Sequence, residues 1–253
     1  MMDATPSPDN PPAEPSSLLD RLTNVIVSPN EVFEEVKAAP VRTSNWLVPL
    51  VLVLLAGVLF GVIAFSQPGV LRSAAEQRER SMAKQVAAGK ITQAQADQAS
   101  TMMEKFFTPA VQKVLGIGFV NCASIFCLFV LSFGTWLGLR VCWKNPVTYM
   151  KIVEVSGLAL VIDVPQKIVR TWLVSWKENM LVTVSPTLFL PNPDLTNKAH
   201  LFLSMIDLID FWWLAILTLG ISKVASVSFG KAAVLTCGIW FGLRIVATLL
   251  TPS

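Results

Sequence analysis

Long apolar runs alternate along the chain with shorter polar connections, and this pattern predicts helices that cross a membrane. A helix of about 20 mostly apolar residues is long enough to span the hydrocarbon core of a bilayer. Five segments meet that requirement: residues 46–65, 114–139, 149–172, 201–222 and 231–250. We therefore predict an all-α fold, a polytopic helical membrane protein in which residues 44–251 form a five-span membrane domain.

The polar sequence before the first span divides into two parts. Residues 1–16 are rich in Pro, Ser, Asp and Glu, and such a segment buries too little apolar surface to offset its ordering entropy, so we predict a disordered tail. Residues 17–43 carry apolar positions at helical spacing and predict short amphipathic helices at the membrane surface, lying either on the membrane or on the bundle of spans. Ser28, Pro29 and Glu31 fit a capping box there, with Ser28 and Glu31 bonding reciprocally and Pro29 at the first helical position.

The longest polar connection lies between the first two spans and predicts a helical hairpin outside the bilayer, over residues 69–107. Residues 71–88 consist largely of good helix formers. Gly89 and Lys90 break this helix, and Thr92 with Gln95 forms a capping box for the next one. Methionine and phenylalanine side chains at residues 102–107 either pack on the ends of the spans or hold a partner.

Three G-x-x-x-G patterns lie within the predicted spans. Glycines four residues apart let two membrane helices approach closely, although the pattern is also common by chance. The candidate helix-packing positions are Gly57, Gly61, Gly134, Gly138, Gly238 and Gly242.

Several ionisable residues fall inside the predicted spans, where a charge is costly. On insertion scales a charge at the centre of a span costs about 2.5–3.5 kcal/mol, so each needs a partner, a water-filled recess or a place near the headgroups. Three of them recur at i, i+4 and i+7 on one helical face, where local pairing lowers the cost, and Pro165 among them predicts a kink or break. The candidate polar network comprises Asp163, Lys167, Arg170, Asp207, Asp210 and Arg244.

Three of these residues belong to the last two spans. Counted from the outer ends of the two helices, at Leu201 and Leu250, Asp207 and Arg244 both lie at a depth of about 9 Å, at about 1.5 Å per residue. Helices joined by a short turn are usually adjacent and antiparallel. We therefore predict an Asp207–Arg244 ion pair, with Asp210 one turn deeper.

Composition strengthens the membrane assignment and argues against several classes of function. The 253 residues are 53% hydrophobic and 15% charged, whereas soluble domains hold about 25% charged residues. The net charge of +3 is too small to argue for nucleic acid as a partner. Four cysteines without a C-x-x-C pair, together with the single His200, predict no metal centre, and nothing in the sequence predicts a cofactor.

Motifs of enzymes are absent from the sequence. It contains no G-x-S-x-G, no H-E-x-x-H and no phosphate-binding G-x-x-x-x-G-K-[ST]. The acids Glu154, Asp163, Asp207 and Asp210 offer candidates for a pair that shares a proton, as in a membrane hydrolase. Such a pair needs two acids at one depth on facing helices, which the sequence does not indicate, so we predict no enzymatic activity.

Basic residues in the short turns predict the orientation. Arg140, Lys144 and Lys151 surround the turn between the second and third spans, and Lys223 and Lys231 that between the fourth and fifth. Short cytosolic loops carry an excess of Lys and Arg, which places the N-terminus in the cytosol and the C-terminus outside. The hairpin between the first two spans is also basic and argues for the opposite orientation.

Three stretches resemble a known family in their order and spacing. The first is IVSPNEVFEEV at residues 26–36, followed by Pro40 and WLVPL at residues 46–50. The second runs from Asp207 through Trp212, and the third is LTLGISKV at residues 217–224, continuing to Ser228, Lys231 and Ala232. Over residues 18–250 the chain is similar to the Yip family, the Ypt/Rab-interacting membrane proteins, in its prokaryotic form.

The resemblance implies five spans, a cytosolic N-terminus and a bacterial inner-membrane location, and it implies no catalytic residues. Eukaryotic members of the family are implicated in vesicle traffic and small-GTPase binding. This sequence lacks the Asp-Leu-x-Gly-Pro stretch associated with that branch, so GTPase binding is implied by family analogy only.

Two classes of function fit these observations. The first is a non-enzymatic scaffold or adaptor in membrane organisation or trafficking-like processes, with the lipid bilayer and other membrane proteins, or a second copy, as partners. The second is a small-solute or ion permease in which Asp163, Asp207, Asp210 and Arg244 line a polar path. Many transporters are built from repeated halves, and the five predicted spans show no repeat, so we favour the scaffold.

Overall fold

The computed structural model describes residues 16–194 and 196–250, and all regular elements in this part are helical. The predicted disordered tail, residues 1–16, lies outside the described residues except for Ser16. The helices are α1 Leu18–Val27, α2 Pro29–Ala38, α3 Ser44–Ala64, α4 Pro68–Ala87, α5 Gln93–Phe106, α6 Pro109–Trp143, α7 Tyr149–Ala159, α8 Asp163–Lys177, α9 Lys198–Ser204, α10 Leu208–Val224 and α11 Phe229–Leu250, with 3-10 turns η1 Leu160–Ile162 and η2 Pro186–Phe189.

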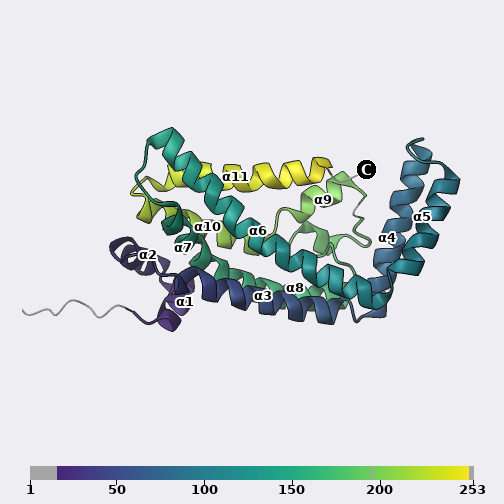
Figure 1. Ribbon diagram of the computed structural model, residues 1–253, viewed down its shortest axis with the longest axis horizontal. Helices are drawn as coiled ribbons and strands as arrows, with labels where there is room; N and C mark the ends of the chain where they lie inside the picture. The colour runs from purple at the N-terminus through teal and green to yellow at the C-terminus, as the bar shows by residue number, and fades with distance from the viewer. Residues whose placement is uncertain (1–15, 195, 251–253) are drawn as a thin grey trace, which may run out of the picture.

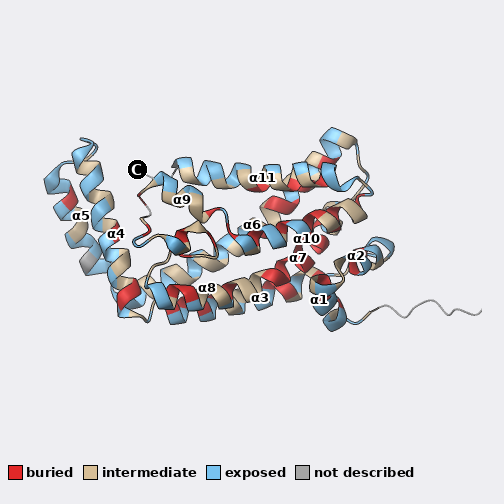
Figure 2. Ribbon diagram, turned by 180° about the vertical axis from the view of Figure 1, so that it is seen from behind, coloured by how far each residue is buried: buried red, intermediate tan, exposed pale blue. Residues whose placement is uncertain are grey.

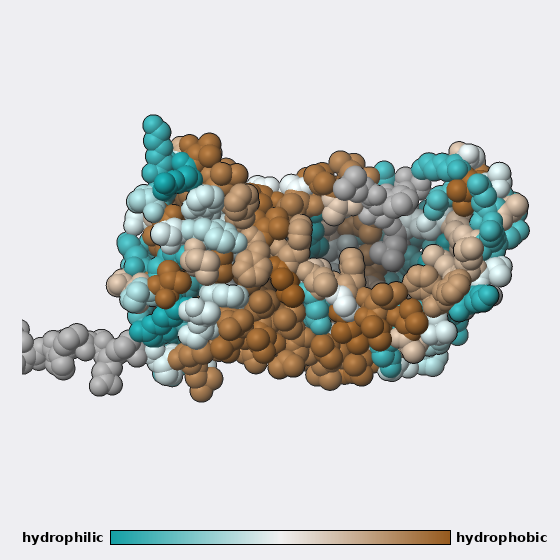
Figure 3. All heavy atoms as spheres, viewed as in Figure 1, coloured by the Kyte–Doolittle hydropathy of each residue, from teal (hydrophilic) through white to brown (hydrophobic). Residues whose placement is uncertain are grey.

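The helices form an elongated bundle with distinct ends. Helices α3, α6, α8 and α11 run along its length, α1 and α2 lie at one end, and α4 and α5 stand side by side at the other (Figure 1). The middle of the surface is a hydrophobic band, and hydrophilic residues gather towards both ends (Figure 3). This distribution is the one expected when the long axis crosses a bilayer.

Three helices are long and apolar enough to cross a membrane, and a fourth crossing is made if a bent pair is counted as one. The three are Ser44–Ala64, Pro109–Trp143 and Phe229–Leu249, and the bent pair is Lys198–Ser204 with Leu208–Val224. The predicted span 149–172 is divided instead into α7, η1 and α8. Pro165 lies in the first turn of α8, where a missing N–H costs little, so the predicted break is confirmed, while a fifth span stays a prediction.

The predicted span 201–222 is not one continuous helix. Its two helices meet at an angle of 51° across a break of three residues, and Asp207 is the N-cap of α10, accepting a hydrogen bond from the backbone N–H of Ile209 at 2.8 Å. Asp207 therefore satisfies a free backbone donor at a helix start, as N-cap residues do, and stands at the break between the two helices.

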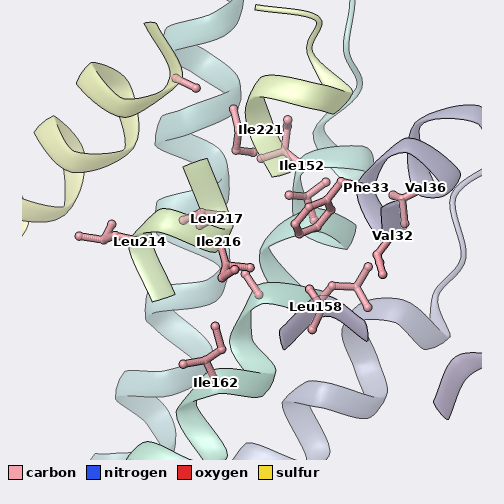
Figure 4. Packing of buried hydrophobic residues seen from close by; sticks show 14 of the residues in the cluster. Val32, Phe33, Val36, Ile152, Leu158, Ile162, Leu214, Ile216, Leu217 and Ile221 are labelled. Carbon is pink, nitrogen blue, oxygen red and sulfur yellow. The ribbon is translucent and has the colours of Figure 1, made fainter. Parts of the chain in front are cut away.

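Helices α1 and α2 are packed into the main hydrophobic core against α7 and α10. Phe33 of α2 is 0% exposed and reaches towards Ile152 and Ile221 (Figure 4). A Cβ added to Gly220 of α10 would lie 2.8 Å from the Phe33 ring and 2.6 Å from Val155. Only glycine leaves room there for α2 to approach.

The structure corrects the predicted capping box at Ser28. The Ser28 side chain makes no capping hydrogen bond, although Pro29 does occupy the first turn of α2 as predicted. Ser28 also ends α1, where its N–H bonds to Asn24 at φ −133° and ψ 57°, so its backbone does not adopt the extended cap geometry. A capping box forms instead at Ser17 and Asp20.

The other predicted capping box, in the connection between α4 and α5, is confirmed. Thr92 and Gln95 bond reciprocally at the start of α5. The preceding turn passes through Gly89 at φ +67°, a conformation that glycine adopts without strain.

Two of the three G-x-x-x-G patterns are helix contacts. Asn121 and Ile117 of α6 lie against the first pair, and Leu235 and Ile239 of α11 lie against the second. The third pair, on α11, is a correction, because a Cβ added there meets nothing within 4 Å among the described residues. On α11, the leucine and isoleucine side chains face α6, whereas the two glycines lie on another face of the helix. The three pairs are Gly57 and Gly61, Gly134 and Gly138, and Gly238 and Gly242.

Candidate functional site

A polar pocket of about 360 Å³ lies inside the bundle, between α6, α8, α10 and α11. Figure 3 shows a hollow with hydrophilic groups inside it on the face where α6 and α11 diverge. All six ionisable residues predicted as an intramembrane network line this pocket: Asp163, Lys167, Arg170, Asp207, Asp210 and Arg244. The structure therefore brings together ionisable residues from three separate segments of the chain, α8, α10 and α11.

Helix α8 supplies one wall of the pocket through a polar stripe. Asp163, Gln166, Lys167 and Arg170 line the pocket, because positions i, i+3, i+4 and i+7 share one face of a helix. Lys167 forms an ion pair with Asp163 within this stripe, as their spacing predicts. Trp172, on the remaining surface of α8, is exposed.

Helices α10 and α11 are joined by an ion pair at the opposite wall. The Arg244 guanidinium lies 2.6 Å from Asp210 Oδ2, and Gln166 Nε2 donates to Asp210 Oδ1 at 2.7 Å. The predicted partner of Arg244 was Asp207. That prediction assumed a continuous helix. Because the helix is broken before α10, Asp207 caps the start of α10 and Asp210 is the residue that pairs with Arg244.

Two buried N–H groups in the pocket wall have no hydrogen-bond partner in the described part of the chain, namely Arg170 Nε and Trp213 Nε1. Arg170 is held by neutral groups: its Nη2 donates to the carbonyl of Met180 at 3.2 Å, and its guanidinium lies 5.5 Å from the centroid of the Phe60 ring. The sequence analysis missed Gln166 and Trp213. Gln166 stands between Asp163 and Lys167 on the predicted polar face, which is the signal that could have found it.

The acids of the pocket are bound to neighbouring groups of the protein. Each pocket aspartate is engaged by another group, Asp163 by Lys167, Asp207 by the start of α10 and Asp210 by Arg244. Among the described residues no group of three His, Cys, Asp or Glu side chains is placed to hold a metal ion. Chemically, the pocket offers unsatisfied donors and charged walls within an apolar bundle.

A second polar cluster fixes α1 and α2 to the bundle, and it is centred on Glu154 of α7. Glu154 is 0% exposed and accepts from Asn45 Nδ2 at 2.7 Å, from the Arg42 N–H at 3.1 Å and from Lys151 Nζ at 2.7 Å. Arg21 of α1 donates in turn to Asn45 Oδ1 at 3.0 Å. Glu154, considered above as a hydrolase acid, therefore serves as a structural anchor.

The same cluster also holds the C-terminal half of α2. Arg21 pairs with Glu35 at 3.1 Å, and Lys151 Nζ donates to the carbonyl groups of Val36 and Ala39 at 2.8 and 2.9 Å, where α2 ends. The sequence analysis missed Arg21. Its position beside the buried Leu22 on an amphipathic helix was the available signal, because a charge next to an apolar stripe needs a partner.

An exposed ion pair adds a third link between α2 and the bundle. Lys223 Nζ, near the end of α10, lies 2.9 Å from Glu34 Oε1. The hydrogen bond from Lys223 lowers the pKa of the Glu34 carboxyl below its ordinary value.

Comparison with known proteins identifies one family. A family model described as the Yip1 domain matches residues 23–251, from within α1 to just past the end of α11. Searches of the curated proteins and of the solved structures found no match.

Proposed function

The chain belongs to the Yip1 domain family, and we propose that it is a non-enzymatic scaffold or adaptor that binds another membrane protein, or a second copy of itself, through the end formed by α1 and α2. Its apolar helices make it an integral membrane protein. The observation that carries the proposal is the attachment of α1 and α2 to the bundle through the buried Glu154 cluster.

That attachment leaves an apolar stripe of α1 facing outwards. Leu19 and Val27 are 73% and 74% exposed, and with Thr23 they occupy positions i, i+4 and i+8 of one helical face. A fixed helix that presents apolar side chains loses little conformational entropy on binding. This geometry suits the binding of a partner protein better than catalysis.

We place this end on the cytosolic side of a bacterial inner membrane. The α6–α7 and α10–α11 connections lie at the same end as α1 and α2 (Figure 1). Basic residues lie in these connections or in the helix turns that lead into them: Arg140, Lys144 and Lys223. An excess of basic residues in short loops marks the cytosolic side.

Affinity purification from native membranes tests the proposal. Exchanging both Leu19 and Val27 for serine removes the exposed apolar stripe and leaves the buried face of α1 intact. We expect one membrane protein to co-purify with the wild type, to be lost with this double variant, and to bind the wild type again when both are purified.

A matched control applies the same exchange at the opposite end of the molecule. Phe106 and Phe107 are exposed beside the α5–α6 junction, and serine at both positions should leave the partner bound. Loss of the partner with the control alone would assign recognition to the α4–α5 hairpin and contradict the proposal.

The polar pocket favours a second candidate function, a permease for a small solute or ion. Ionisable residues inside a membrane bundle are by default functional candidates. Flux in proteoliposomes that is abolished by Arg244→Leu would support the permease and contradict the scaffold. The scaffold proposal expects no flux above that of empty vesicles.

A further inference from the structure

The geometry points to a binding site, in the pocket between α6, α8, α10 and α11, for the anionic phosphate headgroup of a membrane lipid that enters sideways between α6 and α11. This inference does not depend on the scaffold proposal. It rests on three features of the pocket: its unmet donors, its charge arrangement and its open apolar flank.

The unmet donors call for a ligand that accepts hydrogen bonds. Arg170 Nε and Trp213 Nε1 are both buried, both belong to pocket-lining residues, and neither has an acceptor in the described chain. A buried donor without a partner is costly, because the group has lost its water and gained nothing in return. Phosphate oxygens are strong acceptors and match the guanidinium in geometry.

The charges in the pocket favour an anion beside Arg170. Two of the acids form ion pairs, Asp163 with Lys167 and Asp210 with Arg244. The third, Asp207, accepts the Ile209 N–H at the start of α10 and forms no ion pair with a described residue. The direct partners of Arg170 are by contrast a carbonyl group and an aromatic ring. Among the cationic side chains that line the pocket, Arg170 is therefore the one whose charge a ligand can pair with.

The flank of the pocket indicates that this ligand comes from the bilayer. Helices α6 and α11 pack at Gly138 and Leu235 and diverge towards the other end of α6 (Figure 1). Phe119, on the α6 edge of the pocket, is 77% exposed, and Ala123 beside it is also exposed. A phospholipid could place its headgroup inside and leave its acyl chains on this apolar edge, which a soluble anion would have to cross.

Lipid titrations of the full chain in detergent test the assignment. Phosphatidylglycerol, zwitterionic phosphatidylcholine and inorganic phosphate are added separately, and the unfolding midpoint is followed, since a ligand that binds only the folded state raises it. We expect phosphatidylglycerol alone to give a saturable rise. An equal rise with phosphatidylcholine, or a saturable rise with inorganic phosphate alone, would overturn the proposal.

Matched variants locate the effect in the pocket. Trp213→Phe removes the indole N–H together with part of the ring, and Trp212→Phe makes the same change at an exposed neighbour outside the pocket lining. We expect Trp213→Phe to weaken phosphatidylglycerol binding on the order of tenfold, the usual effect of losing a hydrogen bond to a charged group. Equal binding by both variants would overturn the assignment of Trp213 as a donor.

Variants of Arg170 test its role as a phosphate ligand in the same manner. Arg170→Gln should lower the apparent affinity more than tenfold, an effect on the order of a lost charge-assisted hydrogen bond, while Arg140→Gln, at an exposed position near the end of α6, should not change it. If Arg170→Gln fails to fold, Arg170→Lys keeps the charge and removes the planar donor set. Undiminished binding by the folded arginine variant would overturn the proposal.

A steric variant tests the sideways entry. Ala123→Trp fills the α6 edge of the pocket without altering a polar group, and Cys122→Trp adds the same bulk to the adjacent position, which is exposed and outside the lining. We expect Ala123→Trp to abolish the phosphatidylglycerol shift and Cys122→Trp to retain it. Retention of the shift by both variants would overturn entry between α6 and α11.

Discussion

At the scale of single residues, the two aspartates near the start of α10 have different tasks although they lie three positions apart. Asp207 accepts the Ile209 N–H at the helix start, and Asp210 pairs with Arg244. Both are buried, so burial alone does not separate them. Their backbone positions do, because only the N-cap carboxylate reaches the free donors of the first turn.

A double-mutant cycle tests whether Asp210, and not Asp207, is the ion-pair partner of Arg244. Asp210→Asn and Arg244→Leu should each lower the free energy of unfolding by about 1–3 kcal/mol, less than for a fully buried pair, because the Arg244 side chain is 39% exposed. Their effects should be coupled by about 0.5–3 kcal/mol. Asp207→Ala should cost about 1 kcal/mol as a lost cap and show weaker coupling to Arg244→Leu. Stronger coupling through Asp207 would restore the pair predicted from the sequence.

Gly220 provides a second test at this scale. Gly220→Ala places a Cβ 2.8 Å from the Phe33 ring, and we expect a loss of about 1–3 kcal/mol in stability, the usual cost of overpacking. Gly238→Ala is the matched control, since its added Cβ meets nothing within 4 Å and alanine favours the helix by up to about 1 kcal/mol. Chemical denaturation in detergent compares the two. Equal effects would contradict the close approach of α2 to α10.

At the scale of elements, apolar runs predicted where helices lie but not where they break. The uninterrupted span 46–65 became α3 because its sequence contains no charge, and the helix continues through Pro49, which lies inside it in the second turn. The hydropathy of residues 201–222 predicts one continuous span. Hydropathy alone does not indicate that Asp207 caps a new helix and so marks a break. Pro165 was a visible signal, and the break near it was predicted.

Contacts between distant elements were partly predictable. The glycine pairs of α3 and α6 mark real contacts, whereas the pair on α11 has the same spacing and marks none among the described residues. The spacing of a motif does not say which face of a helix meets a neighbour. The Glu154 cluster joins residues over 100 positions apart, and no local pattern connects Asn45 with Glu154.

Glutamate 154 should control how firmly α1 and α2 are attached. Glu154→Gln keeps the shape of the side chain but leaves the ammonium group of Lys151 without its buried carboxylate, a change that costs up to about 3–5 kcal/mol. We expect faster hydrogen exchange over α1 and α2 in this variant. Glu31→Gln, at an exposed position of α2, should leave exchange unchanged. Unaltered protection in both variants would show that apolar packing alone holds these helices.

The Glu34–Lys223 pair should make the attachment of α2 depend on pH. Because the pKa of Glu34 is lowered in the folded protein, the pair contributes stability above the ordinary glutamate pKa of about 4.3 and loses it as the pH falls through the lowered value. Exchange over α2 should therefore be faster in Glu34→Gln than in the wild type at pH 7. The two should converge in acid, and a difference that persists at pH 3 would contradict this role.

At the scale of the whole molecule, the apolar band and the internal pocket together describe a protein that keeps its charges away from lipid. On the face seen in Figure 3 the hydrophobic surface covers the middle of the bundle, and Figure 2 shows buried residues concentrated where α7, α10 and the N-terminal helices meet. The polar stripe of α8 faces the pocket. Exposed Trp172 and Trp176 stack at 5.6 Å on the same helix, as expected for aromatic residues at a membrane interface.

This arrangement predicts that α7, η1 and α8 together cross the membrane, although neither helix is long enough alone. Gln77 of α4 donates to the carbonyl of Pro193 at 2.9 Å, which holds the connection after α8 against the hairpin. The α4–α5 hairpin and the connection after α8 should therefore both lie on the side of the membrane opposite to the cytosol. In a cysteine-free background, an impermeant maleimide should label Ala88→Cys and Asn192→Cys on intact cells. Lys37→Cys on α2 should be labelled only after permeabilisation, because α3 separates it from the hairpin. Labelling of residue 192 only after permeabilisation would show that α7 and α8 do not cross, and labelling of Lys37→Cys on intact cells would reverse the orientation.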